Sequence, residues 1–286
     1  MTGKRKWLSR ILFLIGFIIC CYPLISSIIE QQYQKGAVAT YEKEMQKEDD
    51  SKIKESLKKA EEYNSMLYQS DGMSVGDLGD NILSHKSYES LLDLSGTGVM
   101  GSIEIPKINV NLPIYHGTDD SVLSTAAGHV ESSSLPVGGE NTRTVITGHR
   151  GLPNSKLFTR LDEMKEGDLF FINVLGETLA YQVTEIEVID PDDVKKLDIV
   201  PKKDLATLLT CTPYGLNTHR LLVTGERVTY EKEVHDSIEK ETMSARELFF
   251  AVLPFIFLAI KLVPVVVSRI KRKRKEEIKQ NEVKQD

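Results

Sequence analysis

Charge is missing from two long stretches of this chain of 286 residues. Ile11–Ile29 carries no charged side chain, and Leu248–Val267 carries only Lys261. Because a helix needs ~20 apolar residues to cross a bilayer, each stretch is long enough to span a membrane. No small-residue cleavage pattern follows Ile29, which excludes a cleavable signal peptide and favours an uncleaved anchor. The alternative for the second stretch is a buried core helix interrupted by Pro254 and Pro264.

Basic side chains flank both apolar stretches. Four precede the first stretch, and a basic run from Arg269 to Lys275 follows the second. By the positive-inside rule, residues 1–10 and the basic tail 268–286 are both expected in the cytoplasm. The sequence therefore predicts a two-pass membrane protein with spans at 11–29 and 248–267, whose middle part lies on the outer side.

Cysteine is also scarce, with three in the whole chain. Cys20 and Cys21 lie in the first apolar stretch, where a thiol usually serves as a small buried hydrophobic group. Only Cys211, in the stretch TLLTCTPYGLNTHRLLVTGER, belongs to the exported part. Because exported proteins usually pair their thiols, a lone one implies either a bridge to another molecule or a reactive free thiol.

The net charge of −6 is distributed unevenly along the chain. Residues 30–246 hold 23 of the 36 basic and 37 of the 42 acidic side chains, which gives this part a net charge of −14. Such an acidic surface excludes nucleic acid as a plausible partner.

The exported part changes its character near Gly98. Residues 30–97 begin with one or two helices, rich in Glu, Lys, Gln and Ala up to about Tyr68, and continue into a glycine-punctuated loop, QSDGMSVGDLGDN. Residues 98–230 consist of short β-type runs separated by turns, and residues 231–247 form a linker. The candidate strands are Val99–Ile105, Ile108–Ile114, Arg143–Thr147, Leu169–Val174, Leu179–Ile189, Ala206–Cys211 and Arg220–Val228.

Seven or eight short strands with one conspicuous helix, Lys156–Met164, are typical of a closed or nearly closed β-barrel rather than a parallel α/β sheet. Within Leu179–Ile189 the apolar phase changes between Val183 and Ile186, which indicates a β-bulge. The sequence therefore predicts a mainly β domain of ordinary size.

A reactive Cys211 needs a partner, because a thiol with a pKa of ~8.5 is mostly protonated at neutral pH and the thiolate is the nucleophile. Three histidines are candidates. His149, in TVITGHRGLP, follows a β-rich run, His129 lies near a turn in AAGHVE, and His219 directly precedes Arg220.

The strand pattern distinguishes His219 from Arg220. If LATLLTC and HRLLVTGER pair antiparallel, alternation of side chains places only one of the two residues beside Cys211. Arginine is a permanent cation with a planar donor fork, which suits a developing oxyanion or a substrate carbonyl. A buried structural cysteine and a structural arginine are the alternative interpretation of the same residues.

The segments TGHRGLP and TLLTCTPYGLNTHRLLVTG resemble the sortases of Gram-positive bacteria, and among them the class C enzymes that polymerise pilins. Further similar stretches are GSIEIPKINVNLPIYHGT, SSSLPVGG and NSKLFTRLDEMKEGD. The resemblance covers Gly98 to Tyr230, and the layout with two membrane anchors is also similar to class C.

The resemblance implies an eight-stranded sortase-like β-barrel in a cell membrane, with the catalytic domain outside. It further implies that Cys211 is the nucleophile, His149 the acid and base, and Arg220 the oxyanion or substrate-positioning cation. The expected reaction cleaves an LPXTG-like sorting signal between Thr and Gly through a Cys211 thioester, which a pilin lysine then resolves into an isopeptide bond. The expected partners are therefore pilin subunits that bear such signals and acceptor lysines.

Two features depart from the class C pattern. The loop before the barrel has no Asp-Pro-aromatic lid triplet. Two interpretations therefore remain: a lid formed by Asp71, Met73 or Asp77, and an ordinary loop. The family often has Thr-His where this chain has Thr142-Arg143, a change outside the three catalytic positions.

No metal-ligand spacing and no phosphate-binding glycine loop occurs in the sequence, so we expect no cofactor. Two other functions fit parts of the sequence. One is a sortase that attaches surface proteins to peptidoglycan with the same catalytic residues. The other is a catalytically silent pilus-assembly scaffold, which the missing lid triplet would fit.

Overall fold

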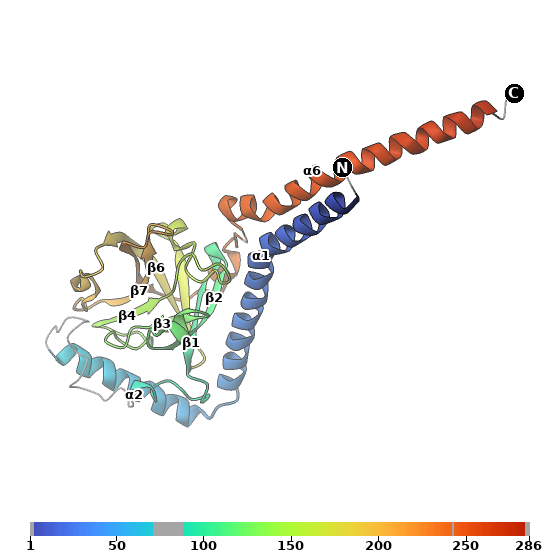
Figure 1. Ribbon diagram of the computed structural model, residues 1–286. Coiled ribbons are helices and arrows are strands. Elements are labelled where there is room, and N and C mark those ends of the chain that lie inside the picture. Colours follow the sequence, from blue (N-terminus) through green and yellow to red (C-terminus); the bar gives the residue numbers. More distant parts are fainter. Residues whose placement is uncertain (1–2, 71–87, 242, 284–286) are drawn as a thin grey trace. The chain divides into compact units, whose positions relative to one another are not determined.

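The computed structural model describes residues 3–70, 88–241 and 243–283 (Figure 1). These residues belong to two compact units. The larger lies within residues 26–242 and contains the β-barrel, whereas the smaller lies within residues 1–25 and 243–286 and contains the apolar helical segments.

Eight strands close into a barrel in the order β1-β2-β3-β4-β7-β8-β6-β5. The strands are β1 Val99–Ile105, β2 Val110–His116, β3 Ala127–His129, β4 Thr142–Thr147, β5 Leu169–Val174, β6 Glu177–Ile189, β7 Asp204–Thr212 and β8 His219–Val228. The pairs β2–β3 and β4–β7 are parallel, and the other pairs are antiparallel. This arrangement confirms the prediction of a mainly β, eight-stranded closed barrel.

The core of the barrel is packed with buried aliphatic and aromatic side chains from its strands. On β5 and β6, the rings of Phe170 and Tyr181 stack with centroids 5.6 Å apart. Gly225 on β8 faces these rings, because a Cβ atom there would lie 2.6 Å from the ring of Phe170. The register of β6 against β8 shifts between Val183 and Glu185, which confirms the predicted bulge.

Three local predictions were wrong. β2 starts at Val110 rather than at Ile108, because Pro106–Ile108 forms a 3-10 turn that ends at a left-handed Asn109 (φ 53°). The three-residue strand β3 was not predicted. The expected helix Lys156–Met164 is instead a series of turns with a 3-10 helix at Leu161–Glu163.

Two helices precede the barrel, as the composition of residues 30–68 predicts. Helix α1 spans Gly3–Met45 and α2 spans Asp50–Gln69, with the Asp49 carboxylate accepting from Ser51 N as the N-cap of α2. The α2 side chain Asn64 donates to the Leu135 carbonyl at 3.1 Å and accepts from the Leu135 amide at 2.7 Å. These reciprocal bonds hold α2 against the barrel (Figure 1).

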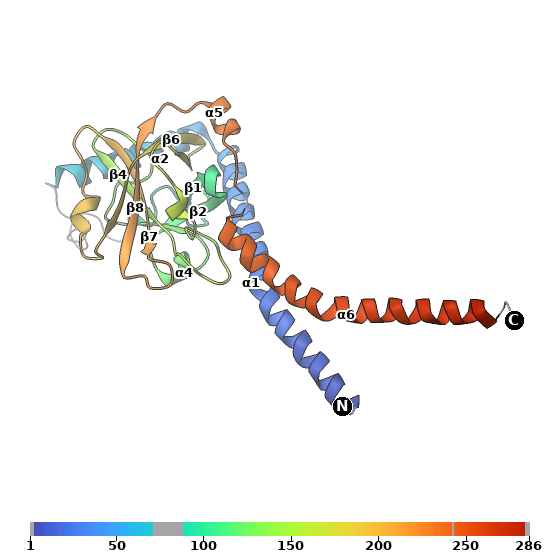
Figure 2. The ribbon, with the colours of Figure 1, turned by 90° about the horizontal axis from the view of Figure 1, so that it is seen from above.

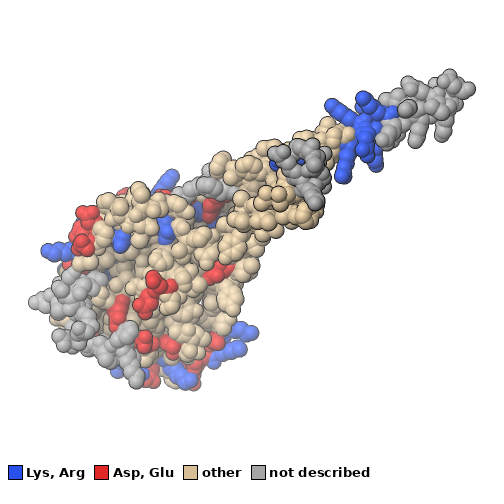
Figure 3. All heavy atoms as spheres, viewed as in Figure 1, with Lys and Arg blue, Asp and Glu red and all other residues tan. Residues whose placement is uncertain are grey.

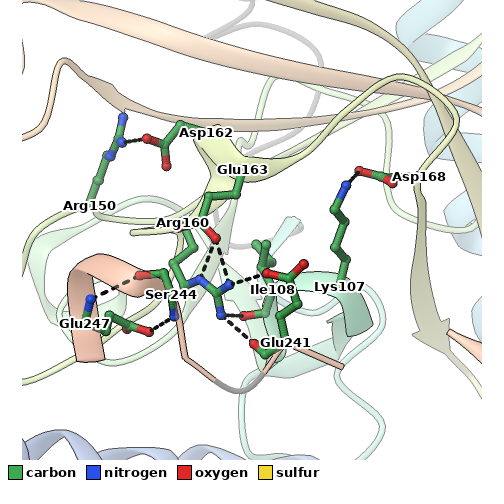
Figure 4. A network of polar contacts seen from close by, with 10 residues as sticks. All are labelled: Lys107, Ile108, Arg150, Arg160, Asp162, Glu163, Asp168, Glu241, Ser244 and Glu247. Carbon is green, nitrogen blue, oxygen red and sulfur yellow. Dashed lines mark hydrogen bonds and ion pairs between the residues drawn. The ribbon is translucent and has the colours of Figure 1, made fainter. Parts of the chain in front are cut away.

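The segment after β8 is also attached to the barrel. It contains α5 (Lys232–Ser237), in which the ring of His235 stacks on Phe171 with centroids 3.9 Å apart. Further along, the buried guanidinium of Arg160 donates to the Glu241 carbonyl at 2.6 Å and pairs with the Glu163 carboxylate at 2.7 Å (Figure 4). Residues 231–241 of the expected linker therefore contact the barrel through specific side-chain and backbone interactions.

The smaller unit contains most of the first apolar stretch and all of the second. Helices long and apolar enough to cross a membrane cover Trp7–Met45 and Glu247–Lys275, and 0% and 6% of their most apolar windows are buried. The second lies in α6 (Ala245–Val283), so the alternative of a buried core helix is wrong. Figure 3 shows an elongated part almost bare of charge and then a collar of basic side chains. In the sequence, the basic run Arg269 to Lys275 follows the second apolar stretch.

Candidate functional site

Cys211 and Arg220 lie directly opposite each other at the ends of β7 and β8. Strands β7 and β8 lie side by side (Figure 2), and their antiparallel register pairs Cys211 with Arg220 and Thr212 with His219. Paired residues on adjacent antiparallel strands present their side chains on the same face of the sheet. The thiol and the guanidinium therefore share one face, and His219 belongs to the opposite face.

His149 follows the end of β4, the strand on the other side of β7 from β8. Strands β4 and β7 are parallel, and their register ends with Thr147 opposite Leu209, two residues before His149 and Cys211 respectively. The Gly148 amide donates to the Leu209 carbonyl at 3.2 Å, and the buried Thr210 hydroxyl donates to the Gly148 carbonyl at 2.7 Å. Both bonds attach the backbone before His149 to the backbone before Cys211.

The chain beyond His149 turns sharply back onto it. The Phe158 amide donates to the His149 carbonyl at 3.1 Å. A Cβ atom at Gly148 would lie 3.0 Å from the Phe158 ring, so glycine lets the end of β4 pass close to this ring. The position of His149 is thus fixed by backbone contacts on both sides.

Cys211, Arg220 and His149 are each half-buried, and Cys211 is a free thiol. The Arg220 guanidinium donates to the carbonyls of Asn217 and His219, at 3.4 and 3.2 Å, which hold it over the β7–β8 loop. A half-buried free thiol whose cross-strand partner is a cation is the kind of environment in which reactive cysteines occur. Such a thiol is chemically suited to nucleophilic attack.

Leu209 packs against a small apolar cluster near Cys211 in the chain. The cluster contains the buried side chains of Val145, Ile189, Leu197 and Leu222, with Val130 and Leu209 packed against it. Leu209 precedes Cys211 by two positions on β7 and shares its face of the strand.

The other two candidate histidines lie apart from the thiol. His219 Nε2 is 3.5 Å from the Asp190 carboxylate on the opposite face. His129 is fully buried in β3, where its Nε2 lies 2.9 Å from the Ser134 carbonyl and its Nδ1 lies 2.8 Å from the Tyr88 hydroxyl. Since a carbonyl only accepts, Nε2 carries the proton and Nδ1 accepts from Tyr88.

Burial lowers the pKa of His129 to about 4, although its hydrogen bond to the Ser134 carbonyl acts in the opposite direction. The unfolded chain therefore binds the proton first, and stability is lost as pH falls from 6.5 towards 4. We expect His129→Gln to reduce the stability difference between pH 7.5 and pH 4 by about 3 kcal/mol. Urea unfolding of the full chain in detergent, followed by circular dichroism, measures this difference. An unchanged pH dependence in the variant would contradict the assignment.

The lid-position residues Asp71, Met73 and Asp77 lie outside the described residues. Arg143 stands where the family often has the histidine of Thr-His. Its side chain is buried, and its Nη1 donates to the Thr207 hydroxyl at 3.0 Å. Across residues 3–70, 88–241 and 243–283, His, Cys, Asp and Glu form no group of three that could hold a metal ion.

Sequence reasoning missed Arg150, the residue after His149. Its side chain is buried, forms an ion pair with Asp162, and donates from Nη1 to the Thr212 hydroxyl at 3.1 Å. An arginine directly after a candidate base is the only sequence signal of this contact, because both partners lie far along the chain.

The chain is similar to known sortases over the barrel. A family model described as the sortase domain matches residues 103–228. Sortase D of Bacillus subtilis (strain 168) is 33% identical over 132 residues, which cover 45% of this chain and 64% of that protein. For sortase A of Streptococcus agalactiae the match covers 61% of its length, so the chain spans a little under two thirds of both curated relatives.

Two solved structures agree over a larger part of the chain. Sortase C1 of Streptococcus agalactiae is 45% identical with a TM-score of 0.64, and the match covers 68% of this chain and 99% of that one. Sortase C of Streptococcus pneumoniae is 40% identical with a TM-score of 0.60, over 68% of this chain and 97% of that one. The barrel, the motifs and these likenesses together establish that the chain belongs to the sortase family of transpeptidases and groups with its class C members.

Proposed function

We propose that this sortase cleaves an LPXTG-like sorting signal between Thr and Gly and joins the acyl group to a lysine of a pilin subunit. The observation that carries the proposal is the register of β7 against β8, which pairs Cys211 with Arg220. The parallel pairing of β4 with β7, which ends two residues before His149 and Cys211, supports a place for His149 beside them. Each of the three side chains then has a separate chemical role.

In the first step, Cys211 gives its thiol proton to His149, and the sulfur attacks the Thr carbonyl carbon and forms a tetrahedral intermediate. The Arg220 guanidinium stabilises the negative charge on its oxygen. His149 donates a proton to the Gly nitrogen as the Thr–Gly bond breaks, which leaves a thioester on Cys211 and a free glycine amine.

In the second step, a pilin lysine amine attacks the thioester carbonyl. His149, now neutral, accepts the proton that the amine loses, and Cys211 leaves as a thiolate. The product is an isopeptide bond between the Thr carbonyl and the lysine nitrogen. Because water competes with the amine, the thioester needs shielding until the second pilin has bound.

Two observations support a pilin substrate and a membrane location. The solved sortase C of S. pneumoniae is reported in connection with pilin substrate specificity. This chain also has an apolar helix at each end, and the second is followed by a basic run. We place both basic flanks in the cytoplasm and the barrel on the outer side of the membrane.

The full chain in detergent, incubated with a peptide containing Leu-Pro-Glu-Thr-Gly and with pilin, tests this function. We expect a Cys211 thioester by mass spectrometry and lysine-dependent pilin ladders on gels. If only glycine amines resolve the thioester, the result contradicts pilin polymerisation and supports attachment of surface proteins to peptidoglycan. If no thioester forms, the result contradicts an enzymatic function and supports a catalytically silent scaffold.

His219 should be dispensable for this reaction, because the register places it on the face opposite Cys211. We expect His219→Ala to retain the wild-type rate of peptide cleavage within about twofold, as is usual for surface substitutions away from a site. Steady-state cleavage of the same peptide measures the rate. A loss comparable to that of His149→Ala would show that the choice of histidine is wrong.

A further inference from the structure

Arg150 connects the chain on either side of the proposed catalytic pair. It follows His149, and its Nη1 donates at 3.1 Å to the hydroxyl of Thr212, which follows Cys211. Its Nη2 forms an ion pair with the Asp162 carboxylate (Figure 4). The guanidinium therefore bridges the loop after β4, the end of β7 and the 3-10 turn Leu161–Glu163.

The loop after β4 and the β7–β8 loop also pack against each other beside this guanidinium. The Arg150 guanidinium carbon lies 5.9 Å from the centroid of the Tyr214 ring in the β7–β8 loop. A Cβ atom at Gly151 would lie 3.2 Å from this ring, so the backbone after Arg150 is in close contact with Tyr214. The loop after His149 and the loop after Cys211 thus form one packed unit around Arg150.

Stability alone does not explain a buried arginine at this position. Only 3% of its side chain is exposed, and its Nε has no hydrogen-bond partner among the described residues. An unsatisfied buried donor is costly, and well-packed apolar residues are often at least as stabilising as a buried ion pair. Asp162 is 37% exposed, so water can solvate its carboxylate when Arg150 is removed.

We propose that Arg150 is a positioning residue that fixes the distance and orientation of His149 relative to Cys211. This inference rests on the proposed function, in which these two side chains exchange a proton. One contact of Arg150 is with Thr212, the residue after Cys211. The other is with Asp162, in the 3-10 helix Leu161–Glu163. Loss of the bridge lets the loop carrying His149 move relative to β7.

Such a residue should affect turnover more than peptide binding. A displacement of ~1 Å costs on the order of 10²-fold in rate, because proton transfer depends steeply on geometry. We expect Arg150→Met to lower kcat by about that factor and to change KM by less than about twofold, since Arg150 contacts Thr212, whose side chain lies on the face of β7 opposite Cys211. Thr212→Val removes only the hydroxyl acceptor and should lower kcat by about tenfold.

Arg160 provides a matched control. Its side chain is also 3% exposed and ion-paired, but its acceptors are Glu163, Glu241 and the Ile108 carbonyl (Figure 4). Arg160→Met should therefore lose stability without losing kcat. Arg150→Lys keeps the charge but not the two-sided fork, and should recover part of the lost turnover.

The four variants and Cys211→Ala are compared with wild type as full chains in detergent, using a fluorogenic Leu-Pro-Glu-Thr-Gly peptide. The inference is overturned if Arg150→Met and Thr212→Val keep kcat within about twofold of wild type while Cys211→Ala is inactive. It is also overturned if Arg160→Met loses as much kcat as Arg150→Met. Where Arg150→Met does not fold, Thr212→Val decides alone. Full activity of Cys211→Ala, or a wild type without cleavage, instead contradicts the proposed function itself.

Discussion

Replacing Cys211 with alanine should abolish thioester formation and reduce peptide cleavage by about 10⁴-fold or more, as expected when a covalent nucleophile is removed. Cys211 is the only cysteine in residues 30–246, so no second thiol of that part of the chain can take its place. Intact-protein mass spectrometry after incubation with the sorting peptide measures the adduct directly. The expected result is an acylated wild type and an unmodified variant.

The loss should be chemical rather than structural. Cys211 is half-buried near the end of β7, where a change to a smaller side chain leaves the paired strand backbone in place. We therefore expect a change in unfolding free energy of no more than about 1 kcal/mol. Cys211→Ser is the matched control, because its hydroxyl keeps the size and polarity but is a much weaker nucleophile at neutral pH. An adduct on the alanine variant would mean that another residue is acylated.

The barrel could be predicted because its strands carry strong local signals. The ends of β1 and β5 agree with the sequence prediction, since both are runs of apolar and β-branched residues bounded by turns. The bulge in β6 was visible as a change of apolar phase, because alternation is strict within a strand. The β3 strand has only three residues, too few for alternation to be recognised.

The wrong helix at Lys156–Met164 has a physical explanation. Leu157, Phe158, Leu161 and Met164 have helical spacing and are all buried, as a helix would require. However, Leu157 has a left-handed backbone (φ 37°), and the Phe158 amide bonds to the His149 carbonyl instead of a helical partner. The hydrogen bond between Phe158 and His149 thus overrides the helical pattern. The residues of the segment alone give no sign of this bond.

The site was partly predictable for a similar reason. A hairpin between β7 and β8 follows from two apolar runs and a turn, and it brings Arg220 near Cys211. His149 follows β4, which lies beside β7 through a parallel pairing of strands far apart in the chain, and spacing alone cannot predict that pairing. The resemblance of the motif TGHRGLP selected it from three histidines. Arg150 was missed because its partners are known only from the fold.

His149→Ala should lower kcat/KM for peptide cleavage by about 10²- to 10⁴-fold, the usual range for a lost general acid or base. The fold should survive, because Gly148 and the carbonyl of His149 hold this backbone without help from the imidazole. Steady-state kinetics with the sorting peptide measures the loss. His219→Ala is the matched control, since it removes an imidazole on the opposite face of the same sheet.

A second substrate separates the acid role of His149 from a role in shaping the site. An amide nitrogen must be protonated before it can leave, whereas the oxygen of an ester leaves with much less help from an acid. With the Thr–Gly amide replaced by an ester, the deficit of His149→Ala should therefore shrink by about tenfold or more. The deficit of Cys211→Ala should be the same for both substrates, because the thiol is required in either case. If His149→Ala loses the same factor in kcat/KM on the amide and on the ester, His149 does not donate a proton to the leaving group.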